Sequence, residues 1–239
     1  MQIAPVAKTA VSDAVFGHLV DEILSGRLAV DAAMPSEREL ALAFAVNRHA
    51  VREALKRLQQ ARLIRISHGG KTRVENWRET AGLDVLSTLA ATGAVPAVQV
   101  ARDIMVMRRS VAADAARLCA KNATDAQLAG IAAAAAAYPP EQTDESIAAD
   151  LAFWAAVIDG SGNLAYRLAL NTLVAAFADI GFELIAELGT AAELSDRGAH
   201  LALAERLAAR DGEGAHRLAD ELLGRVVEIL STTDSFGRE

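Results

Sequence analysis

The hydrophobic positions of the N-terminal part of the chain follow the period of an α-helix in three stretches. Residues 11–24 place their apolar side chains on one helix face, which predicts a first helix. Ser36 followed by Glu39 matches a capping box, so a second helix begins at this point. Asn47 is placed to cap a third helix, which we expect to extend over residues 48–61. The short interval between the second and third helices predicts a helix-turn-helix.

The pattern then changes from the helical period to alternation. Residues 64–66 and 72–74 alternate apolar and polar side chains on either side of a Gly-Gly pair, which predicts a short β-hairpin. A helix-turn-helix followed by such a hairpin is the order of parts in a winged helix-turn-helix, whose second motif helix enters the major groove of DNA.

Beyond residue 80 the sequence predicts helices alone, because no alternating segment follows. The expected helices cover residues 81–92, 97–121, 124–137, 144–160, 163–188, 191–209 and 212–231, and Thr124 and Asp211 are placed as N-caps. The fold class is therefore mainly α, with an N-terminal winged helix-turn-helix of three helices plus a β-hairpin, and a C-terminal all-α antiparallel bundle. We place the DNA-binding domain at residues 1–76, a joining helix at 77–92 and the helical domain at 93–239.

Charge is distributed unevenly along the 239 residues. Residues 34–78 contain ten Lys or Arg and four Glu, a net charge of +6, so the remainder of this chain of net charge −7 has a net charge of −13. A basic segment on an acidic body is typical of a phosphate-binding domain attached to a soluble, self-repelling partner domain. No signal peptide or membrane-spanning apolar run is found, and the single Cys119 cannot form an intrachain disulfide, so we expect a cytoplasmic protein without membrane contact.

Two arginines on the predicted third helix are the strongest candidates for contacts with DNA bases. Arg48 and Arg52 lie one turn apart, opposite the apolar face, and a guanidinium matches the O6 and N7 acceptors of guanine. Arg38 could contact a base or a phosphate, and His49 is exposed early in the same helix.

The hairpin tip supplies further candidates. His68 and Gly69 could enter the minor groove, since glycine lets the backbone approach sugar and phosphate closely. The alternative is an ordinary surface hairpin in which the glycines only form the turn.

Together these parts resemble the DNA-binding head of the GntR family of bacterial regulators. The family pattern LPSERELA, a turn, then SRxxVREALxxLxxxGL is similar to MPSERELALAFAVNRHAVREALKRLQQARL, and the following HGGKTRVENWRET resembles the FadR subfamily. The resemblance implies DNA contacts at Arg38, Asn47, Arg48, Arg52, His68 and Gly69. Two positions depart from the family pattern, because Asn47 replaces the usual Ser or Thr and Ala61 stands where glycine is common.

Residues 81–231 resemble the FCD effector domain of the same subfamily, a helical bundle around a ligand cavity. The similar segments are MRRSVAADAARLCAKNAT, DLAFWAAVIDGSGN and GAHLALAERLAARDGEGAHRLADELL. Many family members bind a divalent metal through one Asp and three His, and these positions correspond here to Asp150, Trp154, His200 and Leu222. Asp150 and His200 alone should not hold an ion, so we expect no metal and no other cofactor.

Direct contact with a small organic effector is the expected alternative to a metal. Arg108 corresponds to a family arginine that points into the cavity, and it could pair with a carboxylate or an acyl-coenzyme A, or else form a salt bridge. Asp150 and His200 could form a buried hydrogen-bonded pair, and Trp154 could line the cavity or belong to the core. The effector-binding candidates are therefore Arg108, Asp150, Trp154 and His200.

The sequence thus predicts a ligand-responsive transcriptional regulator that acts as a homodimer on a palindromic DNA operator. The family resemblance implies a repressor, and an activator is the alternative. A metal-dependent carboxylate sensor of the same family is one alternative. An enzyme with an appended DNA-binding head is another, but the chain has no nucleophile elbow, glycine-rich phosphate loop or paired catalytic carboxylates, so no catalytic residue is assigned. A purely architectural DNA-binding protein would not need a cavity-forming bundle.

Overall fold

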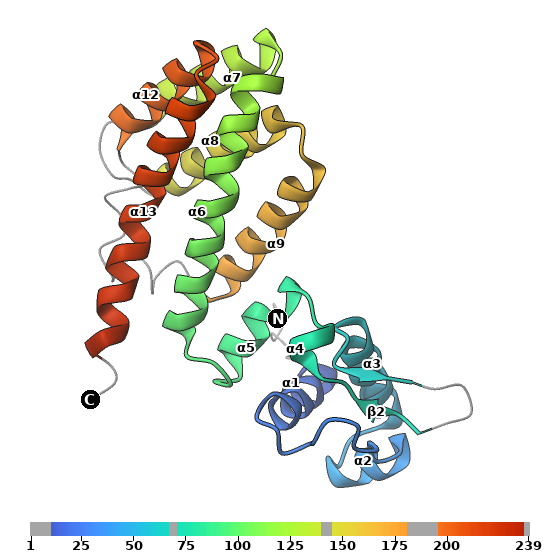
Figure 1. Cartoon of the computed structure of the whole chain (residues 1–239). Helices are drawn as coiled ribbons and strands as arrows, with labels where there is room; N and C mark the ends of the chain where they lie inside the picture. The colour runs from blue at the N-terminus through green and yellow to red at the C-terminus, as the bar shows by residue number, and fades with distance from the viewer. Residues whose placement is uncertain (1–10, 67–70, 140–144, 181–195, 237–239) are drawn as a thin grey trace, which may run out of the picture. The chain divides into compact units, whose positions relative to one another are not determined.

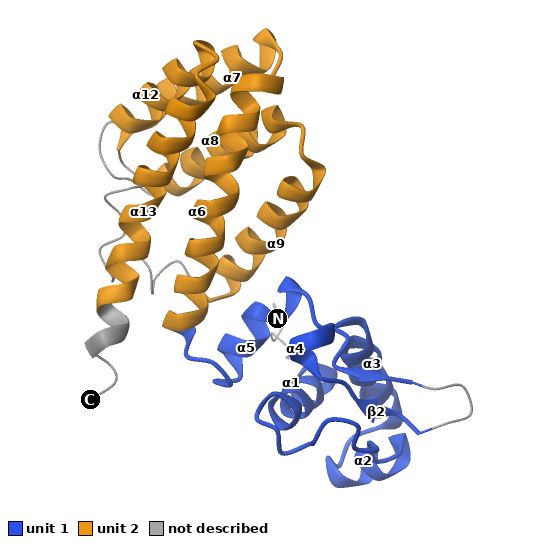
Figure 2. Ribbon diagram, in the orientation of Figure 1, with its two compact units in different colours: residues 1–97 blue, residues 98–239 orange. Residues whose placement is uncertain are grey.

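The computed structural model describes residues 11–66, 71–139, 145–180 and 196–236, with side chains through residue 232. The chain divides into two compact units, residues 1–97 and residues 98–239 (Figure 2). Within the described ranges, no helix is both long enough and apolar enough to cross a membrane.

The described part of the first unit contains three helices, a two-stranded sheet and three short helical segments. In chain order its elements are α1 (Val11–Leu24), α2 (Glu37–Ala43), α3 (Arg48–Gln60), β1 (Ile64–Arg65), β2 (Arg73–Val74), α4 (Trp77–Thr80), the 3-10 helix η1 (Leu83–Val85) and α5 (Leu86–Ala91) (Figure 1). α1 packs across α3, and Val20, Val51 and Leu58 from these helices are fully buried. Burial of each such side chain contributes about 1.5–3 kcal/mol, and this packing holds α3 on the body of the unit.

The N-terminal ends of α2 and α3 are held by the predicted caps. The Glu39 amide donates to the Ser36 hydroxyl at 3.3 Å, and the Ser36 amide donates to the Glu39 carboxylate at 2.8 Å, so the capping box is confirmed. The Asn47 side-chain oxygen accepts the Ala50 amide at 2.9 Å, which confirms the N-cap of α3. The Ser36 cap fixes where α2 begins, and the Asn47 cap fixes where α3 leaves the turn.

β1 and β2 form the predicted antiparallel hairpin, with Ile64 opposite Val74 and Arg65 opposite Arg73. Ile64 and Val74 are buried while both arginines are exposed, as the alternating sequence requires. The Asp31 amide donates to the Val74 carbonyl at 2.9 Å, so the segment that precedes α2 lies along the hairpin and holds it against the helices.

The end of α3 differs by one residue from the sequence interpretation. Ala61 has an ordinary helical φ of −72°, whereas Arg62 has a φ of 57°, in the left-handed region. The Arg62 amide donates to the Gln59 carbonyl at 3.0 Å and the Leu63 amide to the Leu58 carbonyl at 2.9 Å, which is the pattern of a helix closed by a left-handed residue. The position that favours glycine is therefore Arg62, and its assignment to Ala61 is wrong because the chain reverses only after the last helical turn is complete.

Residues 77–92 do not form the single joining helix that the sequence predicts. α4 ends at Thr80, and the backbone is extended at Ala81 (φ −73°, ψ 155°) and at Gly82 (φ −103°, ψ −173°) before η1 begins. The Thr80 hydroxyl donates to the Arg62 carbonyl at 2.8 Å, which ties α4 to the end of α3. A glycine inside a helix costs roughly 0.5–1 kcal/mol relative to alanine, so Gly82 favours the break.

The described part of the second unit is helical. Its elements are α6 (Ala97–Asn122), α7 (Asp125–Ala136), α8 (Glu145–Ser161), α9 (Leu164–Ile180), α12 (Arg197–Ala208) and α13 (Gly212–Phe236) (Figure 1). The predicted caps are confirmed, because Thr124 accepts the Gln127 amide at 3.2 Å and Asp211 accepts the Gly214 amide at 2.9 Å. The predicted helices at 163–188 and 191–209 extend into residues 181–195, which lie outside the described ranges.

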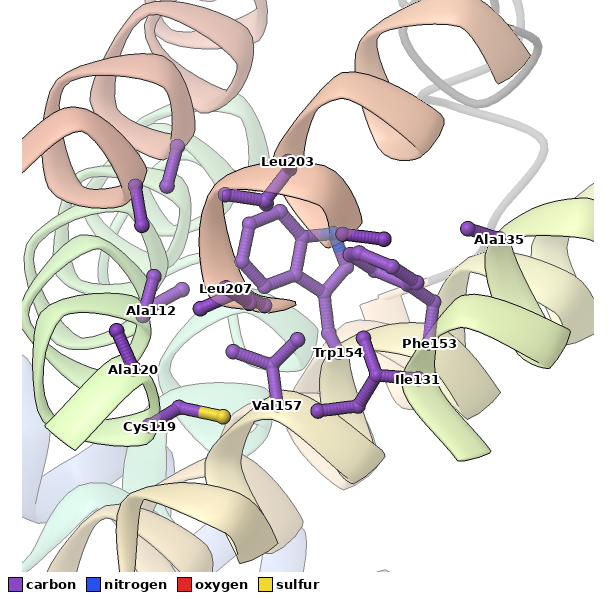
Figure 3. Close-up of a cluster of buried hydrophobic side chains, with 14 of the residues drawn as sticks. Ala112, Cys119, Ala120, Ile131, Ala135, Phe153, Trp154, Val157, Leu203 and Leu207 are labelled. Carbon is purple, nitrogen blue, oxygen red and sulfur yellow. The ribbon is translucent and has the colours of Figure 1, made fainter. Parts of the chain in front are cut away.

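Small side chains let these helices pack closely around one aromatic core. The alanines that line the contacts are all buried: Ala112, Ala116, Ala120, Ala135, Ala215 and Ala219. Gly160 of α8 lies against Cys119 of α6 so tightly that a Cβ at this glycine would be 2.5 Å from the Cys119 sulfur. Trp154 lies at the centre of the core, among Val157, Leu203 and Leu207 (Figure 3).

Candidate functional site

α3 presents two guanidinium groups on the side opposite its buried face. Val51, Ala54 and Leu58 are fully buried, while Arg48 and Arg52 are exposed. The two predicted base-contacting side chains therefore share one accessible face, one helical turn apart. A recognition helix needs this arrangement to present arginines to the major groove.

An acidic side chain, that of Glu37 in the first turn of α2, contacts this face. Arg52 donates to it through two N–H groups, with Nε 3.2 Å from Oε1 and Nη2 2.9 Å from Oε2. The Arg52 guanidinium holds the pKa of Glu37 below its ordinary value, and the charge of Arg48 acts in the same direction. Glu37 is thus ionised at neutral pH and lies close to both arginines. Sequence reasoning missed it because the pair joins two helices.

The other predicted DNA contacts have different surroundings. Arg38 on α2 and His49 on α3 are exposed. Asn47 is exposed too, and its side-chain oxygen caps α3, so only its amide nitrogen lies outside this cap. His68 and Gly69, at the tip of the hairpin, lie outside the described residues.

The second unit contains a buried polar cluster built around Asp150 of α8 and His200 of α12, which are 4% and 0% exposed. The hydroxyl of Tyr138, just after α7, lies 3.1 Å from Asp150 Oδ1 and 2.8 Å from His200 Nε2. His200 Nε2 and Asp150 Oδ1 are themselves 3.7 Å apart, beyond hydrogen-bond distance. The direct Asp150–His200 hydrogen bond expected from the sequence is therefore replaced by a tyrosine bridge.

The other ring nitrogen of His200 fixes the orientation of the imidazole. Nδ1 lies 2.8 Å from the Asp196 carbonyl oxygen, and because a carbonyl can only accept, Nδ1 carries a hydrogen. The Asp196 side chain in turn caps α12 through the Ala199 amide and pairs with Arg225 at 2.6 Å. The Tyr138 ring stacks on the imidazole with a centroid separation of 4.0 Å. His200 is consequently held from several sides.

Arg108 of α6 completes the cluster, with Nη2 2.7 Å from Asp150 Oδ2. The Asp150 side chain is buried, at 5% exposure, and that of Arg108 is partly buried, at 14%. Burial alone would raise the pKa of Asp150, but the Arg108 charge, together with His200 and the Tyr138 hydroxyl, holds that pKa below its ordinary value. Arg108, expected to meet an anionic effector group, thus pairs here with a carboxylate of the protein.

Trp154 borders the same cluster, with its ring centroid 5.9 Å from the Arg108 guanidinium carbon. Its side chain is 1% exposed, and its indole Nε1–H has no hydrogen-bond partner among the described residues. An unsatisfied buried donor of this kind costs about 1–3 kcal/mol, so the position favours an additional acceptor.

The residues present do not fit the metal site that the family resemblance implies. Asp150 and His200 offer ligand atoms, but the indole Nε1–H of Trp154 is a donor only, and Leu222 is a buried hydrocarbon. The Tyr138 hydroxyl already occupies the space between the two ligand atoms. In the described part of the chain, no group of three or more His, Cys, Asp or Glu could hold an ion.

The structure thus brings all four predicted effector residues together and adds Tyr138. The sequence does hold a signal for this residue, because Tyr138 follows a long run of alanines and precedes Pro139. A polar aromatic side chain at the end of so apolar a helix needs a partner for its hydroxyl.

Comparison with solved structures supports the class of fold. The structure of Lar, described as controlling the expression of the Listeria monocytogenes agr system, matches 95% of this chain and 99% of its own, with a TM-score of 0.58 and 14% identity. At that identity the likeness shows the fold alone. The fold is that of a winged helix-turn-helix head followed by a helical domain.

The sequence comparisons establish the family. Residues 11–74 match the model described as bacterial regulatory proteins, gntR family, and residues 103–225 match the FCD domain. The HTH-type transcriptional regulator Mce2R of Mycobacterium tuberculosis is 31% identical over 225 residues, covering 93% of this chain and 92% of its own. A fatty acid metabolism regulator protein of Edwardsiella ictaluri is 31% identical over 166 residues, covering 69% and 68%. The chain belongs to the GntR family of transcriptional regulators and has an FCD domain.

Proposed function

We propose that this chain is a ligand-responsive repressor that binds a palindromic DNA operator as a cytoplasmic homodimer. The observation that supports this most directly is the joint exposure of Arg48 and Arg52 on α3. One head contacts only a few base pairs, so a two-fold symmetric pair of heads would double the contact. The residues assigned to the operator contact are Arg38, Asn47, Arg48, His49, Arg52, His68 and Gly69.

The DNA contact is tested by substitution of the two arginines. An operator is first selected from a pool of random duplexes with the full-length chain, and binding is then titrated by fluorescence anisotropy at fixed salt. We expect Arg48→Ala and Arg52→Ala each to lose roughly 1–3 kcal/mol of preference for the operator over random DNA. Lys56→Ala, on the same helix, is the control and should weaken both duplexes alike. If both arginine variants keep the wild-type preference for the operator over random DNA, the assignment of Arg48 and Arg52 as base contacts is wrong.

The effector site is assigned to the buried cluster of Arg108, Asp150, Trp154 and His200, with Tyr138 added. A partly buried guanidinium is suited to an organic anion such as a carboxylate or an acyl-coenzyme A. An effector oxygen that accepts the Trp154 indole N–H would also relieve the cost of an unsatisfied buried donor. Binding at this cluster would alter operator affinity only if the effector binds the DNA-competent and incompetent states differently.

The effector assignment is tested by thermal unfolding against a panel of carboxylates and acyl-coenzymes A. We expect a member of the panel to raise the melting temperature of the wild type and to raise that of Trp154→Phe less, because phenylalanine lacks the N–H. Trp77→Phe, in the first unit, serves as the matched control. A compound that stabilises Trp154→Phe as much as the wild type would show that the indole N–H is not a contact.

A further inference from the structure

The ion pair between Glu37 and Arg52 differs in its geometry from the Lys56–Glu53 pair on α3. Arg52 donates through Nε and Nη2 to the two oxygens of Glu37, at 3.2 and 2.9 Å, so the carboxylate binds one edge of the guanidinium in a bidentate pair. The neighbouring Lys56–Glu53 pair has a single contact of 2.9 Å and joins residues of the same helix. A single contact restrains position, whereas a paired contact also fixes the plane and direction of the guanidinium.

The edge of Arg52 that Glu37 does not occupy remains available to DNA. The Arg52 side chain is 57% exposed. Guanine needs two N–H donors for O6 and N7, and the edge formed by Nη1 and the second hydrogen of Nη2 can supply them. The Glu37 pair and the guanine contact therefore use different edges of the same group and can exist together.

Glu37 also places a negative charge next to the two arginines of the recognition helix. The carboxylate is 37% exposed and interacts with Arg48 as well as with Arg52. A carboxylate on a DNA-binding face repels phosphates, and this repulsion weakens binding to every sequence equally. The carboxylate beside the arginines is therefore a cost to affinity, which a gain in selectivity would explain.

We propose that Glu37 is a specificity-determining residue, which holds the Arg52 guanidinium with its free edge toward guanine and weakens binding to non-operator DNA. This inference rests on the proposed operator binding and adds to it a residue that acts through Arg52. Without the carboxylate, Arg52 must lose the freedom of a long side chain when it binds the base, and it can also turn to a phosphate of any sequence.

The test compares Glu37→Gln with Glu53→Gln in the full-length chain. Each substitution removes one negative charge near Arg52, so both should raise affinity for random duplex DNA. Glu37→Gln should raise it more, because the freed Arg52 can also bind a phosphate of any sequence. Ordering one long side chain costs about 0.5–1.5 kcal/mol, so Glu37→Gln should lower the ratio of operator to random-duplex affinity roughly two- to twelvefold. Glu53→Gln should leave the ratio unchanged. Thermal unfolding of each variant checks that the head remains folded.

A double-mutant cycle separates positioning from direct contact. In an Arg52→Ala background, Glu37→Gln should cause no further loss of selectivity, because Glu37 acts through the arginine. An unchanged ratio in the single Glu37→Gln variant would overturn the inference, as would a further loss in the Arg52→Ala background, which would mean that Glu37 contacts a base itself. If the wild-type chain selects no sequence from the pool, the proposed function fails before this comparison begins, so the two failures are distinct.

Discussion

Replacement of Arg108 by Met should remove the positive charge that pairs with the buried carboxylate of Asp150, while most of the aliphatic part of the side chain is kept. The pair is 2.7 Å long with both side chains largely buried, so loss of one partner leaves a carboxylate in an apolar core. Removal of one partner of a buried ion pair costs about 3–5 kcal/mol, which is a large part of the stability of a typical domain. We expect the free energy of unfolding of the second unit to fall by this amount near neutral pH.

The pH dependence of this loss follows from the Asp150 pKa, which is lowered in the wild type and should be raised in Arg108→Met. In the wild type, the folded-state pKa of Asp150 is held below its ordinary value, so its stabilising contribution is present at neutral pH and is lost as the pH falls through that lowered pKa. In Arg108→Met, burial dominates and raises the folded-state pKa, so the variant is penalised at neutral pH and recovers as the carboxyl takes up a proton. The difference between the two proteins should therefore shrink as the pH falls to about 4.

The assay is urea unfolding followed by the fluorescence of Trp154, in a Trp77→Phe background so that the signal reports the second unit alone. Arg109→Met is the matched control, because Arg109 binds Asp220 through two contacts of 2.6 Å but both side chains are about a third exposed. Exposed pairs contribute about 0–1 kcal/mol, so this variant should change little. A loss below about 1 kcal/mol for Arg108→Met, or a loss that does not depend on pH, would refute the buried-pair argument.

Three further predictions concern the end of α3, the tyrosine bridge and the metal positions. Arg62→Gly should stabilise the first unit by up to about 1 kcal/mol, because glycine adopts the left-handed backbone at this position without strain. Ala61→Gly should destabilise the unit by about 0.5–1 kcal/mol. Melting temperatures that both rise or both fall would contradict the assignment of the left-handed residue to position 62. Tyr138→Phe should lower the unfolding free energy by roughly 1–3 kcal/mol, since Asp150 and His200 both lose the hydroxyl, and a neutral effect in urea would show that the bridge is not formed. Elemental analysis after dialysis against zinc should find no stoichiometric metal, and one chelatable ion per chain would contradict the mismatch at Trp154 and Leu222.

Local signals in the sequence predicted much of the fold. Caps such as Ser36, Asn47 and Thr124 act on amides within the same turn, so their role can be recognised from residue order alone. The left-handed residue at the end of α3 was predicted one position too early, because backbone geometry determines its position. Position 62 holds an arginine and not the glycine that would have marked it. The break at Gly82 was missed because the apolar pattern on either side is compatible with one continuous helix.

The candidate sites were less accessible to sequence reasoning, because their contacts join distant segments. Tyr138 meets His200 across 62 positions, and Glu37 meets Arg52 across 15. Neither separation matches a local period, so no pattern within one helix could predict these contacts. The prediction that Asp150 and His200 lie together was close, but only packing shows that a third side chain fills the space between them.

The unsatisfied indole N–H of Trp154 gives the protein a built-in spectroscopic label. The chain has two tryptophans, so a proton–nitrogen correlation spectrum contains two indole N–H signals. The signal of Trp77, in the other unit, supplies the reference. A proton with no acceptor among the described residues resonates upfield of a hydrogen-bonded one, and its signal moves downfield when an oxygen arrives. Occupation of the core beside Arg108 could therefore be followed at one proton, without isotopic labelling of any ligand and before its identity is known.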